Sequence, residues 1–241
     1  MYHLSIIIPL YNEEKRLQKS LKCLKKFLLK KKKNKVETIF VSDGSTDNTN
    51  KLINLFISKN KKFYKFKFIF YKKNIGKGYA VKQGIMKASY NWQLICDSDM
   101  SVEVSQFDDW FKKKMITNKT IAYFGSRNHK DSKITSTLIR EHLGSIFIWI
   151  LKLLFQIKIK DTQCGFKVFH KNYSAKVFRK LSSYRFAFDV ELTLILKRNK
   201  ISIQELPLRW THKNESKLNL IKDMPIMFFD ILIIKFKEIF K

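Results

Sequence analysis

The first half of the chain alternates short apolar runs, rich in β-branched and aromatic residues, with longer stretches whose apolar residues recur every three or four positions. The short runs predict strands, and the longer stretches predict helices. We expect strands at residues 4–9, 36–41, 65–71 and 92–96. Helices are expected at about residues 13–29, capped by Asn12, and at about 45–58 and 76–88. This alternation is typical of an α/β fold with a mostly parallel, Rossmann-like central sheet flanked by helices.

Composition places this pattern in one globular domain. The chain has 241 residues, 45% of them hydrophobic, with only 7 Gly and 3 Pro, which excludes disordered and low-complexity architectures. No internal repeat or flexible linker divides it, so we expect one domain over residues 1–220, followed at 221–241 by an apolar and basic helix. The three cysteines are far apart and form no C-x-x-C pair, which argues against disulfides or a zinc site and for a reducing, cytosolic compartment.

The charge balance is strongly basic. Forty-nine Lys and Arg against 20 Asp and Glu give a formal net charge of +29, which attracts polyanions such as nucleic acids, acidic lipids or phosphorylated substrates. Only seven of the basic residues are Arg, and no nucleic-acid recognition motif is present. We therefore do not expect nucleic-acid binding, and the excess of Lys is equally consistent with a bias in genomic base composition.

Two segments are apolar enough to contact a membrane without crossing it. No uncharged apolar run approaches the ~20 residues that span a bilayer, and the N-terminus enters the first strand without the features of a secretory signal. Residues 143–159 and 224–240 are nonetheless rich in apolar and aromatic residues interleaved with Lys. Such segments fit either a membrane interface or helices of the soluble core.

Acidic residues follow three of the predicted strands, although acid is scarce in this chain. Glu13 follows the first strand, Asp43 the second, and Asp97 and Asp99 the fourth. Because the carboxyl ends of parallel strands meet at one edge of a sheet, where ligands bind, we expect these side chains to converge. Asp97 and Asp99, two residues apart on an extended segment, project to the same side and suit one divalent cation, although aspartates at such positions are more often turn formers and caps.

Four motifs accompany these acidic residues. They are SIIIPLYNEE at 5–14, VSDGSTDNT at 41–49, NIGKG at 74–78 and DSD at 97–99. Together they resemble the motifs of family 2 glycosyltransferases with a GT-A fold. The resemblance implies a nucleotide-sugar donor, with the base and ribose against loop 9–13 and Asp43, and with Mg²⁺ or Mn²⁺ held on the diphosphate by Asp97 and Asp99. The implied donor-binding residues are Pro9, Tyr11, Glu13, Val41, Asp43, Lys77, Asp97, Ser98 and Asp99.

Motifs in the second half of the chain indicate which class of acceptor to expect. GSR at 125–127, DTQCGFK at 161–167, RFAFDVEL at 185–192 and ELP at 205–207 resemble the branch of this family that contains dolichyl-phosphate β-glucosyltransferases and, more distantly, mannose synthases. Met100-Ser101 and Gln163-Cys164 differ from the residues usual in the mannose branch, which favours UDP-glucose over GDP-mannose. The segment 208–210 is similar to part of an element of processive polysaccharide synthases, but Leu206 replaces its Gln and spanning helices are missing, so a polymer synthase is not expected.

The resemblance implies a one-step inverting displacement at the anomeric carbon, with a polyprenyl phosphate as acceptor. A phosphate monoester is largely dianionic at neutral pH, its second pKa being about 6, so no strong general base is required. The guanidinium fork suits phosphate oxygens, which makes Arg127 and Arg140 the expected acceptor-phosphate ligands, together with Lys217. Asp161 and Gln163 are expected to contact sugar or acceptor. The residues expected to take part in catalysis are Asp99, Arg127 and Asp189.

Three alternatives stay open at this point. The donor is GDP-mannose, or the acceptor is a hydroxyl group of a glycan or lipid with Asp189 as general base, or the chain is a basic module without catalysis that binds membrane or nucleic acid. Because a polyprenyl acceptor stays in the bilayer, the preferred hypothesis also predicts a cytoplasmic protein held peripherally at the cytoplasmic face of a membrane. The oligomeric state is left open.

Overall fold

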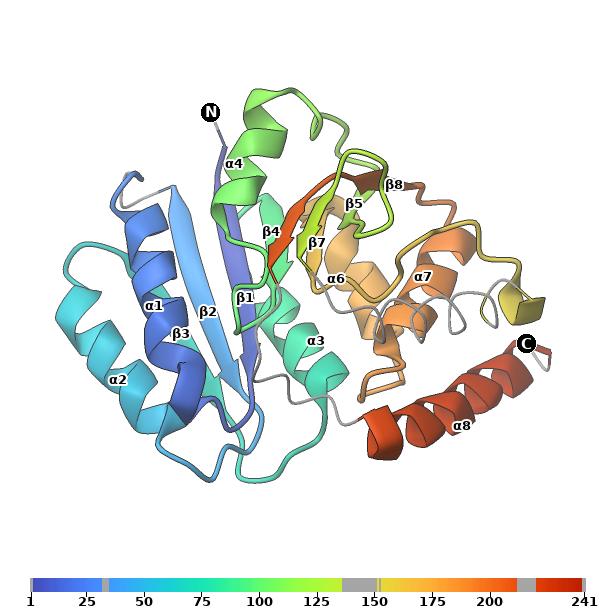
Figure 1. Ribbon diagram of the computed structural model, residues 1–241, viewed down its shortest axis with the longest axis horizontal. Helices are drawn as coiled ribbons and strands as arrows, with labels where there is room; N and C mark the ends of the chain where they lie inside the picture. The colour runs from blue at the N-terminus through green and yellow to red at the C-terminus, as the bar shows by residue number, and fades with distance from the viewer. Residues whose placement is uncertain (1, 32–34, 136–150, 152, 212–219, 240–241) are drawn as a thin grey trace.

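A central sheet organises the computed structural model, which describes residues 2–31, 35–135, 151, 153–211 and 220–239 (Figure 1). The strands are β1 (Leu4–Leu10), β2 (Val36–Ser42), β3 (Lys65–Phe70), β4 (Trp92–Cys96), β5 (Ala122–Gly125), β6 (Lys133–Thr135), β7 (Phe166–His170), β8 (Ile203–Leu206) and β9 (Arg209–Thr211). The helices are α1 (Glu14–Leu28), α2 (Thr49–Asn60), α3 (Lys77–Lys87), α4 (Ser105–Lys112), α6 (Lys171–Arg179), α7 (Phe188–Arg198) and α8 (Leu220–Ile239).

One reversed strand brings two halves of the chain to the same edge of the sheet. Within the described residues the main sheet has seven strands in the order β3-β2-β1-β4-β7-β5-β8. β7 runs antiparallel to β4 and β5, and the other pairs are parallel, which confirms the mostly parallel sheet. Phe166 at the start of β7 pairs with Cys96 at the end of β4. The loop before β7 therefore lies beside the loop after β4.

The two faces of the sheet bury separate apolar clusters. Alternate residues of β1 point to opposite faces, so Leu4, Ile6 and Ile8 pack in one cluster while Ile7 packs in the other. Helices α1, α2 and α4 cover the first face, and α3, α6 and α7 cover the second (Figure 1). This arrangement fixes the strands and leaves their carboxyl ends to carry the polar loops.

The helix starts differ from the sequence prediction at two places. Asn12 does not cap α1, because it adopts φ 52° and its side-chain oxygen accepts a hydrogen bond from the backbone N–H of Thr46 at 2.7 Å. The helix predicted from residue 45 begins only at Thr49, because residues 45–48 are engaged with the loop after β1. Contacts between the two loops thus replace the local caps that the pattern predicted.

The C-terminal helix packs on α7. Met227, Ile231 and Ile234 of α8 are buried against a cluster that includes Val190 and Leu194 of α7. Figure 1 shows α8 along the lower right of the molecule, beneath α7. Among the residues that the structure describes, no helix has both the length and the apolar character needed to cross a membrane.

Candidate active site

The two aspartates after β4 each lie beside a basic residue from another element. Asp97 pairs with Lys77, the first residue of α3, with 2.6 Å between Oδ1 and Nζ. Asp99 accepts a hydrogen bond from the backbone N–H of Ser101 at 2.9 Å, and its other carboxylate oxygen lies 3.8 Å from the guanidinium of Arg16 in α1. The structure thus brings Lys77, Asp97 and Asp99 together at the carboxyl edge of the sheet, as the motifs predicted.

The pKa values of these two carboxyl groups shift in opposite directions. Burial acts to raise the pKa of Asp97, but the Lys77 ammonium, together with the charges of Lys167 and Arg16, outweighs it and holds that pKa below its usual range. At Asp99, burial and the negative charge of Asp97 act together, so the pKa is raised. Burial alone would lower the pKa of Lys77, yet Asp97, Asp189 and Asp99 raise it. Lys77 and Asp97 are therefore both charged at neutral pH.

Glu13 and Ser98, both predicted to bind the donor, bond to each other. The Ser98 hydroxyl donates to Glu13 Oε1 at 2.9 Å, and the Arg16 guanidinium donates to both carboxylate oxygens of Glu13, one of them at 2.7 Å. Glu13 is 5% exposed and Ser98 6%. These contacts fasten the loop after β4 to the start of α1, and a donor contact of either residue stays a prediction.

Asp43 fastens the loop after β3 onto the end of β2. Its carboxylate accepts hydrogen bonds from the side-chain amide of Asn74 and from the backbone N–H groups of Ile75 and Gly76, at 2.7–2.9 Å. Gly76 has φ 129°, and a Cβ there would lie 2.2 Å from the carbonyl oxygen of Tyr184, so only glycine fits. The buried Asp43 is thus part of a rigid framework beneath the expected donor site.

The other predicted donor residues divide into buried and exposed ones. Pro9 and Val41 lie inside β1 and β2, and Val41 belongs to the apolar cluster under α3. Tyr11 follows β1 with 42% of its surface exposed. Of these three, Tyr11 alone has an exposed side chain, and a donor contact of any of them stays a prediction.

Arg127, just after β5, is held by the buried carboxylate of Asp161. Its Nε and Nη2 donate to the two oxygens of Asp161 at 2.7 and 2.9 Å, and its backbone N–H donates to the same carboxylate at 2.9 Å. Asp161 is 1% exposed, whereas the Arg127 side chain is 39% exposed. Burial acts to raise the pKa of Asp161, but the guanidinium outweighs it and lowers that pKa. Asp161 therefore positions a charged arginine whose outer edge faces solvent.

The catalytic candidate Asp189 lies at the start of α7 and is 4% exposed. Its Oδ1 accepts a hydrogen bond from the ammonium of Lys167 at 2.6 Å. Burial raises the pKa of Asp189, and the nearby charges of Lys167 and Lys77 act in the opposite direction. This carboxylate is thus enclosed and partnered rather than open to solvent.

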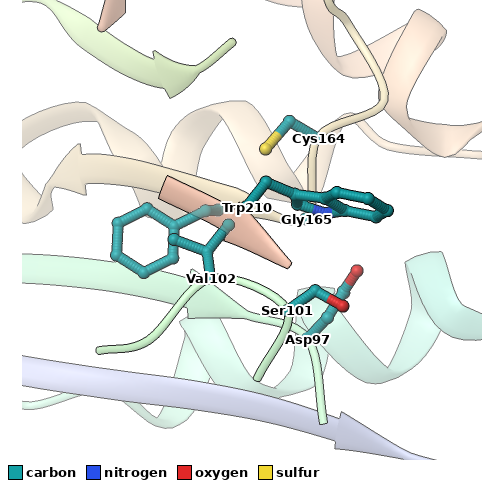
Figure 2. Close-up of a pocket in the computed structure, with 7 residues that line it drawn as sticks. Asp97, Ser101, Val102, Cys164, Gly165 and Trp210 are labelled. Carbon is teal, nitrogen blue, oxygen red and sulfur yellow. The ribbon is translucent and has the colours of Figure 1, made fainter. Parts of the chain in front are cut away.

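A pocket lies directly beside Asp97. It is lined by Asp97, Ser101, Val102, Cys164, Gly165, Phe166 and Trp210. Figure 2 shows the Trp210 indole across the pocket, with Asp97 and Ser101 on one side of the ring and Cys164 on the other. A Cβ at Gly165 would lie 2.0 Å from Asp97 Oδ2, so glycine is what allows the loop before β7 to touch this carboxylate.

Three further predicted residues complete the comparison with the sequence. Gln163 is half-buried and its backbone N–H donates to Asp161 at 3.3 Å. Arg140 and Lys217, the other expected phosphate ligands, lie outside the described residues, as does most of the apolar segment 143–159.

Comparison with known proteins decides the family. Residues 5–181 match the family model described as glycosyl transferase family 2. The chain belongs to this family. It is 35% identical to a dolichyl-phosphate β-glucosyltransferase of Dictyostelium discoideum over 246 aligned residues, which cover 98% of this chain and 74% of that protein.

Solved structures of glycosyltransferases share the fold. A mannosyltransferase of Pyrobaculum calidifontis, solved with GDP-Man and Mn²⁺, superposes with a TM-score of 0.64 at 12% identity, over 99% of this chain and 64% of that one. Glucosyl-3-phosphoglycerate synthase of Mycobacterium tuberculosis, solved with UDP, superposes with a TM-score of 0.66 at 14% identity, over 98% of this chain and 79% of that one. The fold of this family 2 glycosyltransferase is therefore GT-A.

The donor atoms of this glycosyltransferase suit a hard divalent cation. Mg²⁺ and Mn²⁺ prefer carboxylate oxygens, and Mg²⁺ commonly binds one or two carboxylates together with substrate phosphates. Asp97 and Asp99 supply two such carboxylates, and the absence of a side chain at Gly165 leaves Asp97 close to the pocket. Among the described residues, no group of three or more His, Cys, Asp and Glu is placed to hold a metal by itself. Asp97 and Asp99 therefore fit a divalent cation as two of its ligands.

Sequence reasoning assigned no role to Arg16, Lys167 or Trp210. Arg16 lies one turn inside α1 and reaches Glu13 and Asp99 only because the loops fold together. Trp210 belongs to the segment 208–210 that was compared with processive synthases, but that comparison gave it no role. Its position over the pocket depends on β9. Lys167 closes the DTQCGFK segment, and that position in a motif was the one available signal.

Proposed function

We propose that this glycosyltransferase moves a hexose, glucose from UDP-glucose, onto a polyprenyl phosphate with inversion to a β-linked product. The observation that carries the proposal is the 35% identity, over 98% of this chain, to a protein named dolichyl-phosphate β-glucosyltransferase. The charges of the site support it, because carboxylates for a metal–diphosphate lie at the same edge of the sheet as Lys77 and Arg127, which suit two anionic reactants.

In the proposed reaction, a phosphate oxygen of the acceptor forms a bond to the anomeric carbon as the bond to the donor diphosphate breaks. The electron pair of the broken bond leaves with the nucleoside diphosphate. Asp97 and Asp99 would hold Mg²⁺ or Mn²⁺, which supplies Lewis-acid stabilisation of the departing diphosphate. Lys77 adds a fixed positive charge beside that group, and Arg127, oriented by Asp161, binds the acceptor phosphate.

Asp189 supports a phosphate acceptor over a hydroxyl acceptor. A general base must reach the proton that it removes. Asp189 is 4% exposed and already accepts a hydrogen bond from Lys167. A phosphate dianion needs no base, so an enclosed carboxylate that orients other groups is sufficient.

The test is transfer of labelled sugar into an organic-extractable lipid. UDP-glucose and GDP-mannose are each supplied with Mn²⁺, and with either polyprenyl phosphate or the dephosphorylated polyprenol. We expect label from UDP-glucose only with the phosphorylated lipid. Label from GDP-mannose instead would show that UDP-glucose is the wrong donor. Label in the polyprenol would show that the acceptor group is a hydroxyl. Hydrolysis of the donor without transfer would support the nucleotide-sugar donor and contradict the acceptor.

The proposal extends to the membrane, because the outer face of α8 is apolar. This α8 apolar face consists of residues that are 40–65% exposed although the other side of the helix is buried: Ile226, Phe228, Phe229, Leu232, Ile233 and Phe236. With a net charge of +29, the chain is also attracted to anionic headgroups. The face would lie in the interface of the membrane that holds the acceptor, at its cytoplasmic side.

Replacing Phe229 and Phe236 with Asp should release the protein from the membrane. The two side chains are 65% and 64% exposed, so their loss leaves the core intact. Removing two phenylalanines from an apolar environment costs about 1.5–3 kcal/mol each, so we expect binding to anionic vesicles to weaken at least ~100-fold. Co-sedimentation measures it.

Phe63→Asp is the control, because Phe63 is 58% exposed and lies between α2 and β3. It changes the net charge in the same direction, by one unit where the double variant changes it by two, without touching α8. Equal vesicle binding by the double variant and the native protein would contradict the membrane assignment of the α8 apolar face.

A further inference from the structure

A lysine without a role in the proposed chemistry is buried in the site. The side chain of Lys167 in β7 is 1% exposed. Its ammonium donates to the carbonyl of Cys164 and to Asp189 Oδ1, both at 2.6 Å, and lies 5.0 Å from the centre of the Phe124 ring. Burying a charge is unfavourable unless it is paired and hydrogen-bonded. The cost of burying the Lys167 ammonium therefore suggests that its charge has a role in the site.

The Cys164 carbonyl, which accepts a hydrogen bond from this ammonium, belongs to the loop before β7, and that loop is itself fixed at two points. Asp161 is anchored by Arg127, and Gly165 lies against the carboxylate of Asp97. Cys164, between them, is 3% exposed and directs its carbonyl oxygen at Lys167. The position of the Lys167 ammonium is thus set by the same loop that touches Asp97 and orients Arg127.

Asp189 lies between two cations. Lys167 holds it on one side, and Lys77 acts on it electrostatically while pairing with Asp97 at 2.6 Å. Asp97, Lys77, Asp189 and Lys167 therefore form a cluster of two carboxylates and two ammonium groups, joined as two close pairs whose charges also act on one another. In such a cluster, loss of the Lys167 ammonium leaves Asp189 buried with Lys77 as the nearby cation that remains to compensate it.

We propose that Lys167 is a positioning residue that acts through Asp189. It holds Asp189 charged and stationary, so that Lys77 stays paired with Asp97 instead of moving to Asp189. The inference rests on the proposed function, since it assigns Lys167 a part in the same transfer site. Lys167 itself touches neither substrate nor metal in this role.

The test is a double-mutant cycle with Lys167→Met and Asp189→Asn, and with exposed Lys171→Met as the matched control. Two rates are measured: transfer to the polyprenyl phosphate, and slow hydrolysis of UDP-glucose, which needs no acceptor. Melting temperature and the affinity for UDP with Mn²⁺ are measured alongside. We expect Lys167→Met to lower kcat about 100-fold, the effect of a misplaced catalytic group, with the KM for UDP-glucose within three-fold of native.

Because Lys167 acts through Asp189, adding Lys167→Met to Asp189→Asn should cause no further loss of kcat. A multiplicative loss in the double variant, or native kcat in a folded Lys167→Met protein, would overturn the inference. If Lys167→Met alone does not fold, the neutral double variant is compared with Asp189→Asn, and a further ~100-fold loss would again overturn it. If the native protein transfers no sugar to the polyprenyl phosphate, the proposed function is contradicted. The role of Lys167 is then tested separately by the rates of UDP-glucose hydrolysis in the same variants.

Discussion

Asp97→Asn should lower transfer by about 1,000-fold while leaving the protein folded. Asparagine keeps the shape of the side chain but removes the negative charge that pairs with Lys77 and that, with Asp99, suits a divalent cation. Removing one preorganised electrostatic group from an active site typically costs 10²–10³ in rate, and here a metal ligand is lost as well. The Lys77 and Asp97 side chains are 23% and 37% exposed, so the ion pair contributes at most about 1 kcal/mol to stability.

The measurements for Asp97→Asn are kcat/KM with UDP-glucose and the apparent Mn²⁺ affinity by titration. Asp131→Asn is the control, because it makes the same chemical change in a side chain that is 64% exposed and belongs to none of the motifs. Chelation of the metal should reduce the native rate to that of Asp97→Asn. Transfer within ten-fold of native in this variant would exclude the assigned role.

Asp161→Asn should destabilise the protein by about 2–4 kcal/mol at pH 7. The substitution removes the charge that receives three hydrogen bonds from Arg127 and leaves the guanidinium without its counter-ion. Breaking a fully buried ion pair costs about 3–5 kcal/mol, and we expect about 1 kcal/mol less than that because the Arg127 side chain is 39% exposed and regains water. Urea unfolding at pH 7 measures the loss.

The same carboxylate gives the stability a defined pH dependence. Its folded pKa is lowered by Arg127 despite burial, and its unfolded pKa is about 3.9. The contribution of Asp161 is therefore fully present above about pH 4 and is lost as the pH falls through the folded pKa. The free energy of unfolding of the native protein should therefore fall by this amount on acidification below pH 4. Asp161→Asn lacks this contribution, so its free energy of unfolding should not show that fall.

Asp109→Asn is the comparison for Asp161→Asn. It breaks an ion pair with Arg209 whose side chains are 36% and 63% exposed, and it should cost less than about 1 kcal/mol. A loss of similar size in both variants would show that enclosure of Asp161 is not what makes its pair with Arg127 strong.

The sequence predicted the N-terminal half well because each strand there is a short apolar run ended by turn residues. β1, β2 and β4 begin and end within one residue of the predicted bounds. The rule that ligands bind at the carboxyl ends of strands also predicted that Glu13 and Asp99 lie at one edge of the sheet, where Arg16 now contacts both of them. The caps were wrong, because Asn12 and Thr46 bond to each other across two loops, and no local pattern reports such a contact.

The second half was less accessible to sequence reasoning. The direction of β7 follows from its partners β4 and β5, which are distant in sequence. Lys167 would be read as a surface residue in any hydropathy pattern, and only the tertiary structure places it beside Asp189. The same holds for Asp161 and Arg127, which are 34 residues apart.

Helix α7 lies between the active site and helix α8. It carries Asp189, and it also supplies Val190 and Leu194 to the contact with α8. An α-helix with its side chains is about 10–12 Å across. In the proposed orientation, with the α8 apolar face in the membrane interface, α8 and α7 together separate that interface from Asp189, so a lipid phosphate rises by at most about two helix widths while its prenyl chain stays in the bilayer.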